Sequence, residues 1–279
     1  MTLSLSVRIV EEFASKEKAS MPLCELADLA VSAGYEGLCM RGSQVGVHST
    51  PAQVEEAART VRSRGLKVTM VTGDFDIVYN NAKGPECLRH IEPYLDLAEA
   101  LGSRLIRIAM KKPEDIPFAS IAAEAAAARG LRLAHQCHVE SLFETVAGIE
   151  WALKQIDHPN FGLIFEPANL ELCGQDYGAE TIKRLAPWIF NVYLQNQTIR
   201  SEGQLTLNTW CRGPVSFDLA NVGGAGGIDF KGVLMGLAAA DYDGLVTVHQ
   251  SGIPGVAPAD SASMASRFLN GAGSQIESK

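Results

Sequence analysis

The stretch FGLIFEPANLELCG, residues 161–174, contains the clearest strand ending in the chain. Its first five residues are almost all apolar, and Glu166 and Pro167 follow directly. Pro167 ends the strand because proline lacks the N–H group that a strand ladder needs. In α/β proteins, functional groups gather at such carboxyl ends of strands. The alternative interpretation is a solvent-facing loop acid, since acids are mostly exposed.

Strand and helix signals alternate along the whole chain. Eight apolar segments predict strands, at residues 3–9, 35–40, 66–72, 104–109, 131–136, 161–165, 189–195 and 245–249. Helical patterns separate them, one of them over residues 85–101, and glycines such as Gly34, Gly65 and Gly102 stand where short helix-to-strand connections need them. Ser49, Thr50 and Pro51 predict another helix start, with a hydroxyl cap and proline at the first helical position. The pattern predicts an α/β protein, a (β/α)8 TIM barrel that forms a single domain over residues 1–279.

Two segments lie outside this repeating pattern. Residues 196–227 are polar and predict a long loop insertion, a lid or an oligomer arm. A C-terminal tail begins at about residue 254 and has one helical stretch near 262–269. A doubly wound parallel sheet is the alternative fold, but no glycine-rich phosphate loop follows the first strand.

Composition narrows the classes of function. The chain has 279 residues, 47% hydrophobic and 20% charged, with a net charge of −8. An acidic protein is a poor nucleic-acid partner, because phosphate binding needs a basic surface. No apolar run approaches the roughly 20 residues of a membrane span, and the N-terminus does not resemble a secretory signal. We therefore expect a cytoplasmic homo-oligomer that binds a small molecule and neither nucleic acid nor membrane.

The cysteines are scattered through the sequence without the spacing of a metal knot. They are Cys24, Cys39, Cys87, Cys137, Cys173 and Cys211. This distribution favours buried thiols over a disulfide framework or a zinc knot.

Polar side chains stand at or soon after the end of almost every predicted strand. Because all strands of a barrel open on one rim, these side chains should lie close together. The residues concerned are Arg8, Arg41, Arg107, Lys111, Gln136, His138, Glu166, Asn169, Tyr193, Gln195, Asn196 and His249. Buried polar groups cost free energy unless they are paired, so this concentration indicates a functional site.

A divalent metal is one expectation for this rim. Glu166 and His249 offer a carboxylate and an imidazole, and Gln136 and Gln195 offer neutral oxygens. Such a set suits Mn²⁺, Co²⁺, Zn²⁺ or Mg²⁺. The alternative is that these side chains only form hydrogen bonds with one another in a polar barrel mouth.

Four strand-end segments resemble motifs of the xylose isomerase-like TIM barrel superfamily. This superfamily contains sugar phosphate isomerases and epimerases, and it also includes endonuclease IV and inosose dehydratase. The segments are 133–138, 161–174, 191–196 and 246–250, and the resemblance covers about residues 3–250. Typical members bind a metal with Glu, Asp, His and Glu at these strand ends. The corresponding residues here are Gln136, Glu166, Tyr193 and His249.

The resemblance also aligns residues beside the ligand positions. His138 matches a histidine of the fifth-strand motif, Asn169 falls on a histidine and Asn196 on an aspartate. Among the four ligand positions only Glu166 is a carboxylate. The two-glutamate proton shuttle that the resemblance implies cannot operate, because the amide of Gln136 does not titrate usefully. Metal affinity should also change, since imidazole favours softer transition metals.

The residues and the resemblance predict an isomerase- or epimerase-like enzyme. It would move a proton next to the carbonyl of a sugar or sugar acid with assistance from a metal. The candidate acid–base residues are Glu166, His249 and His138. The candidate substrate-binding residues are Arg8, Arg41, Arg107, Lys111, Asn169 and Asn196.

Two other functions stay open at this point. One is a metal-assisted sugar dehydratase or lyase, and the other is a non-catalytic barrel that binds a sugar. Phosphodiester cleavage is disfavoured, because the chain lacks both a carboxylate-rich metal cluster and a basic surface.

Overall fold

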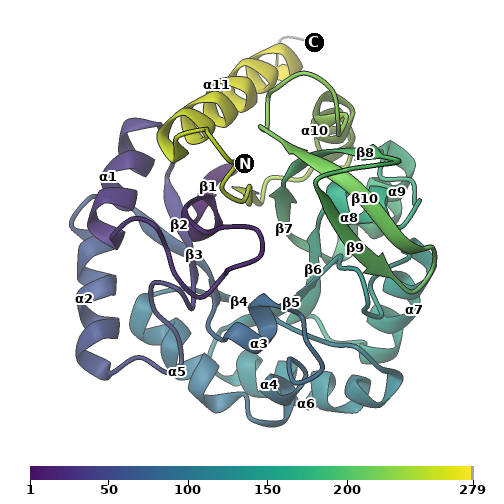
Figure 1. The fold of residues 1–279 in the computed structure, drawn as a ribbon. Helices are drawn as coiled ribbons and strands as arrows, with labels where there is room; N and C mark the ends of the chain where they lie inside the picture. The colour runs from purple at the N-terminus through teal and green to yellow at the C-terminus, as the bar shows by residue number, and fades with distance from the viewer. Residues whose placement is uncertain (278–279) are drawn as a thin grey trace.

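The computed structural model describes residues 1–277 and confirms the predicted barrel. Eight parallel strands close into one sheet in the order β1-β11-β7-β6-β5-β4-β3-β2. Their bounds are β1 (Thr2–Ser6), β2 (Gly37–Arg41), β3 (Lys67–Thr72), β4 (Leu105–Ile108), β5 (Arg132–Gln136), β6 (Phe161–Phe165), β7 (Ile189–Leu194) and β11 (Leu245–Val248). Figure 1 shows this barrel in the middle of the molecule with helices around it. The closed sheet rules out the doubly wound alternative.

Helices cover the outside of the barrel. They are α1 (Leu23–Ser32), α2 (Pro51–Arg62), α3 (Phe75–Val78), α4 (Glu86–Arg89), α5 (Glu92–Leu101), α6 (Ile116–Ala128), α7 (Val146–Ile156), α8 (Pro167–Leu172), α9 (Ala179–Leu185), α10 (Phe230–Ala239) and α11 (Pro258–Glu277). Three short 3₁₀ helices are η1 (Val7–Val10), η2 (Pro113–Asp115) and η3 (Ala186–Trp188). No helix within residues 1–277 is long and apolar enough to cross a membrane.

Local signals explain where several elements begin and end. The Thr50 side chain caps α2 by accepting the Gln53 N–H, and Pro51 occupies the first helical position. Gly102 ends α5 with φ +74°, a conformation that glycine adopts without strain. All five residues of β6 are buried, as the apolar sequence predicts for a parallel strand covered on both faces.

The barrel interior is filled by side chains rather than open. Its cluster contains Cys39, Met70, Leu105, Ala134, Ile164 and Tyr193. The Tyr193 hydroxyl lies 3.2 Å from the Cys39 sulfur, so this ring belongs to the packed interior.

The structure departs from the expected elements at three places near the rim. The first strand ends at Ser6, whose hydroxyl accepts the Arg8 N–H and begins η1. The expected helix over residues 85–101 is divided into α4 and α5. The short helix α8 follows Glu166 directly, because proline at the first helical position suits a helix start as well as a strand end.

The polar segment predicted as a long loop is instead a small antiparallel sheet. It contains β8 (Asn196–Arg200), β9 (Leu205–Thr209) and β10 (Gly213–Ala220), in the order β8-β10-β9. We call residues 196–220 the lid sheet. Alternation of apolar and polar residues, as in β10, marks strands with one buried face. Sequence reasoning missed this pattern because the segment is polar as a whole. The C-terminal tail likewise contains a longer helix than expected, α11.

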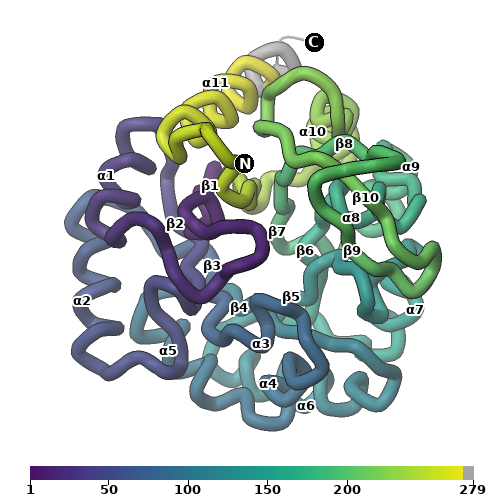
Figure 2. The backbone as a smooth tube through the Cα atoms, in the orientation of Figure 1, coloured from purple at the N-terminus to yellow at the C-terminus, as the bar shows by residue number. Residues whose placement is uncertain are grey.

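The lid sheet and the segment after η1 approach each other over the barrel opening. Val215 and Phe217 of β10 pack with Val139, Leu172 and Cys173. The Phe13 ring meets the Phe217 ring edge to face, with centroids 5.8 Å apart. Figure 2 shows the N-terminal segment crossing the middle of the opening, with the lid sheet to one side of it.

Candidate functional site

A cavity of about 120 Å³ opens where the barrel strands end. Its lining brings together nine of the predicted site residues, namely Arg8, Arg41, Arg107, Gln136, His138, Glu166, Asn169, Gln195 and His249. The other lining residues are Phe13, Lys16, Val78, Tyr79, Asn80, Val139, Glu140 and Leu207. The convergence follows from the barrel, because parallel strands place their carboxyl ends on one rim.

Glu166 lines this cavity and is only 1% exposed. Its Oε2 accepts hydrogen bonds from the Gln136 Nε2 and Asn169 Nδ2 atoms. Burial raises the pKa of Glu166 to about 7, although the two amide donors and the positive Arg107 and Lys16 oppose that rise. A carboxyl group with this pKa can both accept and release a proton near neutral pH.

His249 lines the same cavity as a neutral imidazole. Its Nδ1 lies 3.0 Å from the Ser6 hydroxyl, and its ring stacks on Tyr193 with centroids 3.8 Å apart. Burial and the positive charges of Arg41 and Arg107 hold the pKa of His249 well below its usual value. A neutral ring can exchange hydrogen bonds with a ligand but adds no charge to the site.

His138 is the second imidazole of the cavity. Its Nδ1 lies 3.0 Å from the Asn80 Nδ2 and 2.9 Å from the Val139 carbonyl oxygen. Burial, followed by the charge of Arg107, lowers the pKa of His138 well below its usual value. This imidazole is therefore also neutral.

Two arginines of the cavity share one carboxylate. The Arg41 Nε donates to both oxygens of Glu11, at 3.0 and 2.9 Å, and Ser43 adds a hydrogen bond at 2.5 Å. The Arg8 Nη1 lies 3.5 Å from Glu11 and also donates to the Glu12 carbonyl oxygen at 2.7 Å. Burial lowers the pKa of Arg8 to about 9, whereas the Glu11 carboxylate holds that of Arg41 above its usual value.

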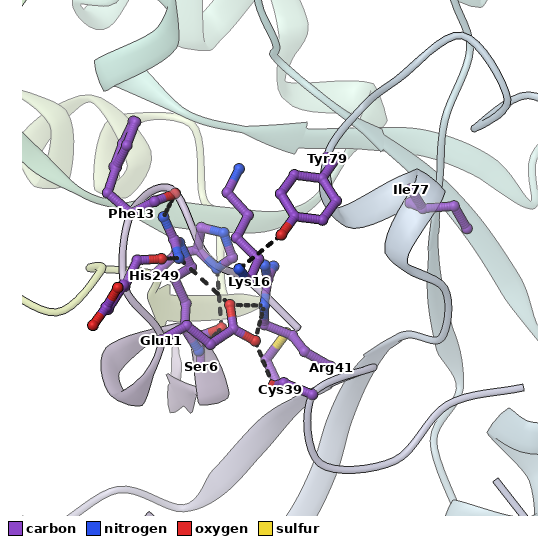
Figure 3. A network of polar contacts seen from close by, with 12 residues as sticks. Ser6, Glu11, Phe13, Lys16, Cys39, Arg41, Ile77, Tyr79 and His249 are labelled. Carbon is purple, nitrogen blue, oxygen red and sulfur yellow. Dashed lines mark hydrogen bonds and ion pairs between the residues drawn. The ribbon is translucent and has the colours of Figure 1, made fainter. Parts of the chain in front are cut away.

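The other two cations have no carboxylate partner among the described residues. Arg107 donates from Nη2 to the Ile77 carbonyl oxygen at 3.3 Å, and its buried Nε has no hydrogen-bond partner there. The Lys16 ammonium lies 5.8 Å from the Phe13 ring centroid and 5.4 Å from that of Tyr79, an arrangement visible in Figure 3. Burial lowers the pKa of Arg107 to about 10 and that of Lys16 well below its usual value.

The site has a positive half and an acid–base half. Arg8, Arg41 and Arg107 belong to β1, β2 and β4 or to the residues just after them, whereas Glu166 and His249 follow β6 and β11. In the closed strand order β6 stands opposite β2, and β11 stands opposite β4. A ligand between the halves would meet positive charge on one side and proton-transfer groups on the other.

Sequence reasoning missed five polar or aromatic residues of the cavity. One is Glu140, and the other four are Phe13, Lys16, Tyr79 and Asn80. These last four follow β1 or β3 at some distance rather than standing at a strand end. The backbone N–H of Lys16 donates to the Tyr79 hydroxyl at 3.0 Å, and this contact joins the two segments. No periodic pattern in the sequence marks such a contact between loops.

The structure places two predicted substrate-binding residues, Lys111 and Asn196, outside the cavity lining. Lys111 donates from Nζ to the Glu140 carbonyl oxygen at 2.8 Å, on the rim. Asn196 is fully buried, where its amide donates to the carbonyl oxygens of Asn221 and Gly226 and accepts from Ile228 N–H. Asn196 therefore fixes the connection between the lid sheet and α10 instead of facing a ligand.

Asn196→Ala is accordingly expected to weaken folding. The change leaves several buried backbone groups without partners, at a cost of about 1–3 kcal/mol. Urea denaturation measures the loss, with Asn208→Ala on the exposed side of β9 as the control. Equal stability of the two variants would contradict this structural role for Asn196.

The fold and this rim define a (β/α)8 barrel with a charged, partly covered site at the carboxyl ends of its strands. The sequence matches the xylose isomerase-like TIM barrel family over residues 27–270, and the chain belongs to this family. No curated protein gives a significant sequence match.

Solved structures share the fold at low sequence identity. A xylose isomerase-like TIM barrel/4-hydroxyphenylpyruvate dioxygenase fusion protein is 20% identical with TM-score 0.72; the alignment covers 99% of this chain and 43% of that one. The probable 3-DHS dehydratase AsbF of Bacillus anthracis is 16% identical with TM-score 0.72, covering 97% and 99%. D-allulose 3-epimerase from Methylomonas sp. is 15% identical with TM-score 0.69, covering 98% of both chains. These likenesses establish the fold alone.

Structures of this fold have also been solved with magnesium, from Mycobacterium smegmatis, and with zinc. The side chains of this chain do not fit a divalent cation at the rim. Glu166 is the only carboxylate of the four ligand positions, and two amide N–H groups already point at its Oε2. The Tyr193 hydroxyl is turned to Cys39 inside the barrel. Positive side chains line the remaining wall, where they would repel a metal ion.

Proposed function

We propose that the chain is an enzyme that transfers a proton next to the carbonyl group of a small sugar acid. The observation that carries this proposal is the position of Glu166, with its pKa near 7, in one cavity with Arg8, Arg41, Arg107 and Lys16. Glu166 would accept the proton from carbon, and the electron pair would move to the carbonyl oxygen. The guanidinium groups would stabilise the resulting enediolate in place of a metal ion.

A negatively charged substrate accounts for the charges better than a neutral sugar. Glu11 is shared by Arg8 and Arg41, and among the described residues Arg107 has only a carbonyl oxygen as its partner. Buried charges without counter-ions are costly, so a ligand carboxylate would stabilise them. Arg107, with its free Nε, and Arg41, with its free Nη1, are the proposed carboxylate-binding groups.

The cavity volume favours a compact substrate. Its 120 Å³ is slightly below the roughly 150 Å³ of a cavity that accommodates benzene. A sugar acid of three or four carbon atoms is the size that we propose for the covered site. Longer sugar acids would need movement of the segment after η1 or of the lid sheet.

A single proton carrier is sufficient for isomerisation through an enediolate, which is the reaction that we propose first. Isomerisation is complete when Glu166 returns the proton to the neighbouring carbon and the hydroxyl proton of the enediolate passes to the former carbonyl oxygen. Loss of a β-hydroxyl from the same enediolate, with the Glu166 proton leaving as part of the water, would instead make the enzyme a dehydratase. The mass of the product distinguishes the two, because isomerisation leaves the mass of the sugar acid unchanged whereas elimination lowers it by one water molecule. We also propose a cytoplasmic location, and the homo-oligomer stays a prediction.

Matched ligands test the proposal. Threonate should raise the melting temperature of the purified protein by several degrees, whereas the uncharged alcohol threitol should not. The shift should be insensitive to EDTA and should persist in Lys111→Ala, since Lys111 lies outside the cavity. Equal shifts with the two ligands, or a shift that requires Mn²⁺, would contradict the proposed anionic, metal-independent site.

A further inference from the structure

Three potential metal ligands from distant parts of the chain meet beneath the tip of the lid sheet. Glu144 lies between β5 and α7, Cys173 ends α8, and Cys211 stands in the turn between β9 and β10. The Glu144 carboxylate and the two sulfur atoms all lie within 4.8 Å of one another. Glu144 and Cys173 are buried, and Cys211 is exposed. We propose that these side chains bind a thiophilic divalent cation such as Zn²⁺.

The spacing suits a metal ion better than a disulfide. Tetrahedral zinc has Zn–S bonds of about 2.3 Å and Zn–O bonds of about 2.0–2.2 Å, which separate the ligand atoms by roughly 3.5–3.8 Å. The ligand atoms of Glu144, Cys173 and Cys211 already lie within 4.8 Å of one another, so a bound ion would need to draw them together by no more than about 1 Å. A disulfide would require the two sulfurs to approach to about 2.05 Å. The exposed side at Cys211 provides an entry path and room for water as the fourth ligand.

Hydrogen bonds already orient the Glu144 carboxylate. Its Oε1 accepts the Glu140 and Trp210 N–H groups at 2.6 and 2.7 Å, and its Oε2 accepts the Cys211 N–H at 2.9 Å. A carboxylate has about four lone-pair directions, so one remains for a cation. Metal-binding carboxylates are commonly held in this way by neighbouring donors. Two of the three donors, the Trp210 and Cys211 N–H groups, come from the same turn that supplies the Cys211 thiol.

A bound ion would fasten the lid sheet to the helix beside the cavity. The Arg212 Nη1 already donates to the Glu171 and Leu172 carbonyl oxygens at the end of α8. The same helix carries Asn169, which donates to Glu166. The proposed ion is thus structural and lies outside the cavity, and the inference does not depend on the proposed function.

The test is a Zn²⁺ titration of chelator-treated, reduced protein by calorimetry, with Co²⁺ absorption as a second measurement. We expect one Zn²⁺ per chain, a higher melting temperature, and a sulfur-to-cobalt charge-transfer band. Cys211→Ser, an exposed change that should leave folding intact, should weaken Zn²⁺ binding at least tenfold, as should Cys173→Ser. Cys24→Ser, at the exposed start of α1, is the matched control and should bind as the unaltered chain does.

Several results would overturn the proposed zinc site. They are a titration without stoichiometric binding, an affinity unchanged by Cys211→Ser, or an equal loss in Cys24→Ser. Loss of binding in His249→Ala with retention in Cys211→Ser would place the ion at the barrel mouth instead. Mass spectrometry that finds a Cys173–Cys211 disulfide in protein unable to bind Zn²⁺ would equally overturn it.

Discussion

Glu166→Gln is expected to lower the rate of solvent deuterium exchange into a bound sugar acid by about 10²–10⁴-fold, the usual contribution of a general base. Glutamine has the same shape, and its oxygen can still accept from Gln136 and Asn169. Threonate should therefore continue to raise the melting temperature of the variant. Binding together with unchanged exchange would show that another group carries the proton, and binding without exchange in either protein would support a non-catalytic barrel.

The same substitution should remove part of the pH dependence of the free energy of unfolding. The pKa of Glu166 rises from 4.5 to about 7 on folding, so the folded chain binds this proton more tightly than the unfolded chain. Its stabilising contribution is complete below pH 4.5 and is lost as the pH rises through about 7. Between pH 5 and pH 8.5 the unaltered protein should lose about 2–3 kcal/mol relative to Glu166→Gln.

Urea denaturation at the two pH values measures this difference. The neutral histidines contribute equally to both proteins, so their titration cancels in the comparison. Parallel pH profiles of the two proteins would contradict the raised pKa. An exchange rate of the unaltered enzyme that increases through pH 7 would support Glu166 as the base, because only the ionised carboxylate accepts a proton.

The second large effect is a contrast between two buried arginines. Arg41→Met should destabilise the protein by about 3–5 kcal/mol, because it removes the main partner of the buried Glu11 carboxylate. Arg107→Met should instead stabilise the ligand-free protein by about 1–3 kcal/mol, because it removes a buried charge that has no carboxylate partner within the part of the chain that the structure describes. Both variants should lose the stabilisation by threonate.

Denaturation with and without threonate measures both arms of this contrast. The difference in sign between the variants is the decisive outcome, since both changes replace an arginine with a side chain of similar length. A loss of stability in Arg107→Met comparable to that in Arg41→Met would mean that the fold compensates the Arg107 charge. The proposed carboxylate site would then have lost its main support.

The barrel was predictable because its signals are local and repeated. The apolar strand before Glu166 has the predicted bounds, and all of its residues are buried. The start of α2, capped by Thr50, also lies where the sequence predicts it. Strand-end residues such as Arg41 and Glu166 could be placed on one rim, since the closed sheet fixes their neighbourhood.

The remaining parts depend on contacts between distant loops. Asn196 looked like a rim residue, but the chain turns away at that point into the lid sheet and buries its amide. Lys16 had no signal of its own, because its position follows from contacts of its segment with Tyr79 and Phe13. The partners of the buried arginines could not be predicted either. Glu11 pairs with Arg41 rather than with Arg107 because of their positions in the folded chain, which the sequence alone does not give.

The edge-to-face contact of Phe13 with Phe217 bears on how long a ligand stays bound. Such a ring pair contributes only about 0.5–1.5 kcal/mol beyond its buried area. We therefore expect the lid sheet and the segment after η1 to separate many times during the lifetime of the complex, while the barrel stays folded. Escape would then be limited by the ion pairs of a carboxylate with Arg41 and Arg107. Changes at Phe217 should therefore alter the association and dissociation rates of the ligand by the same factor, with little effect on its affinity.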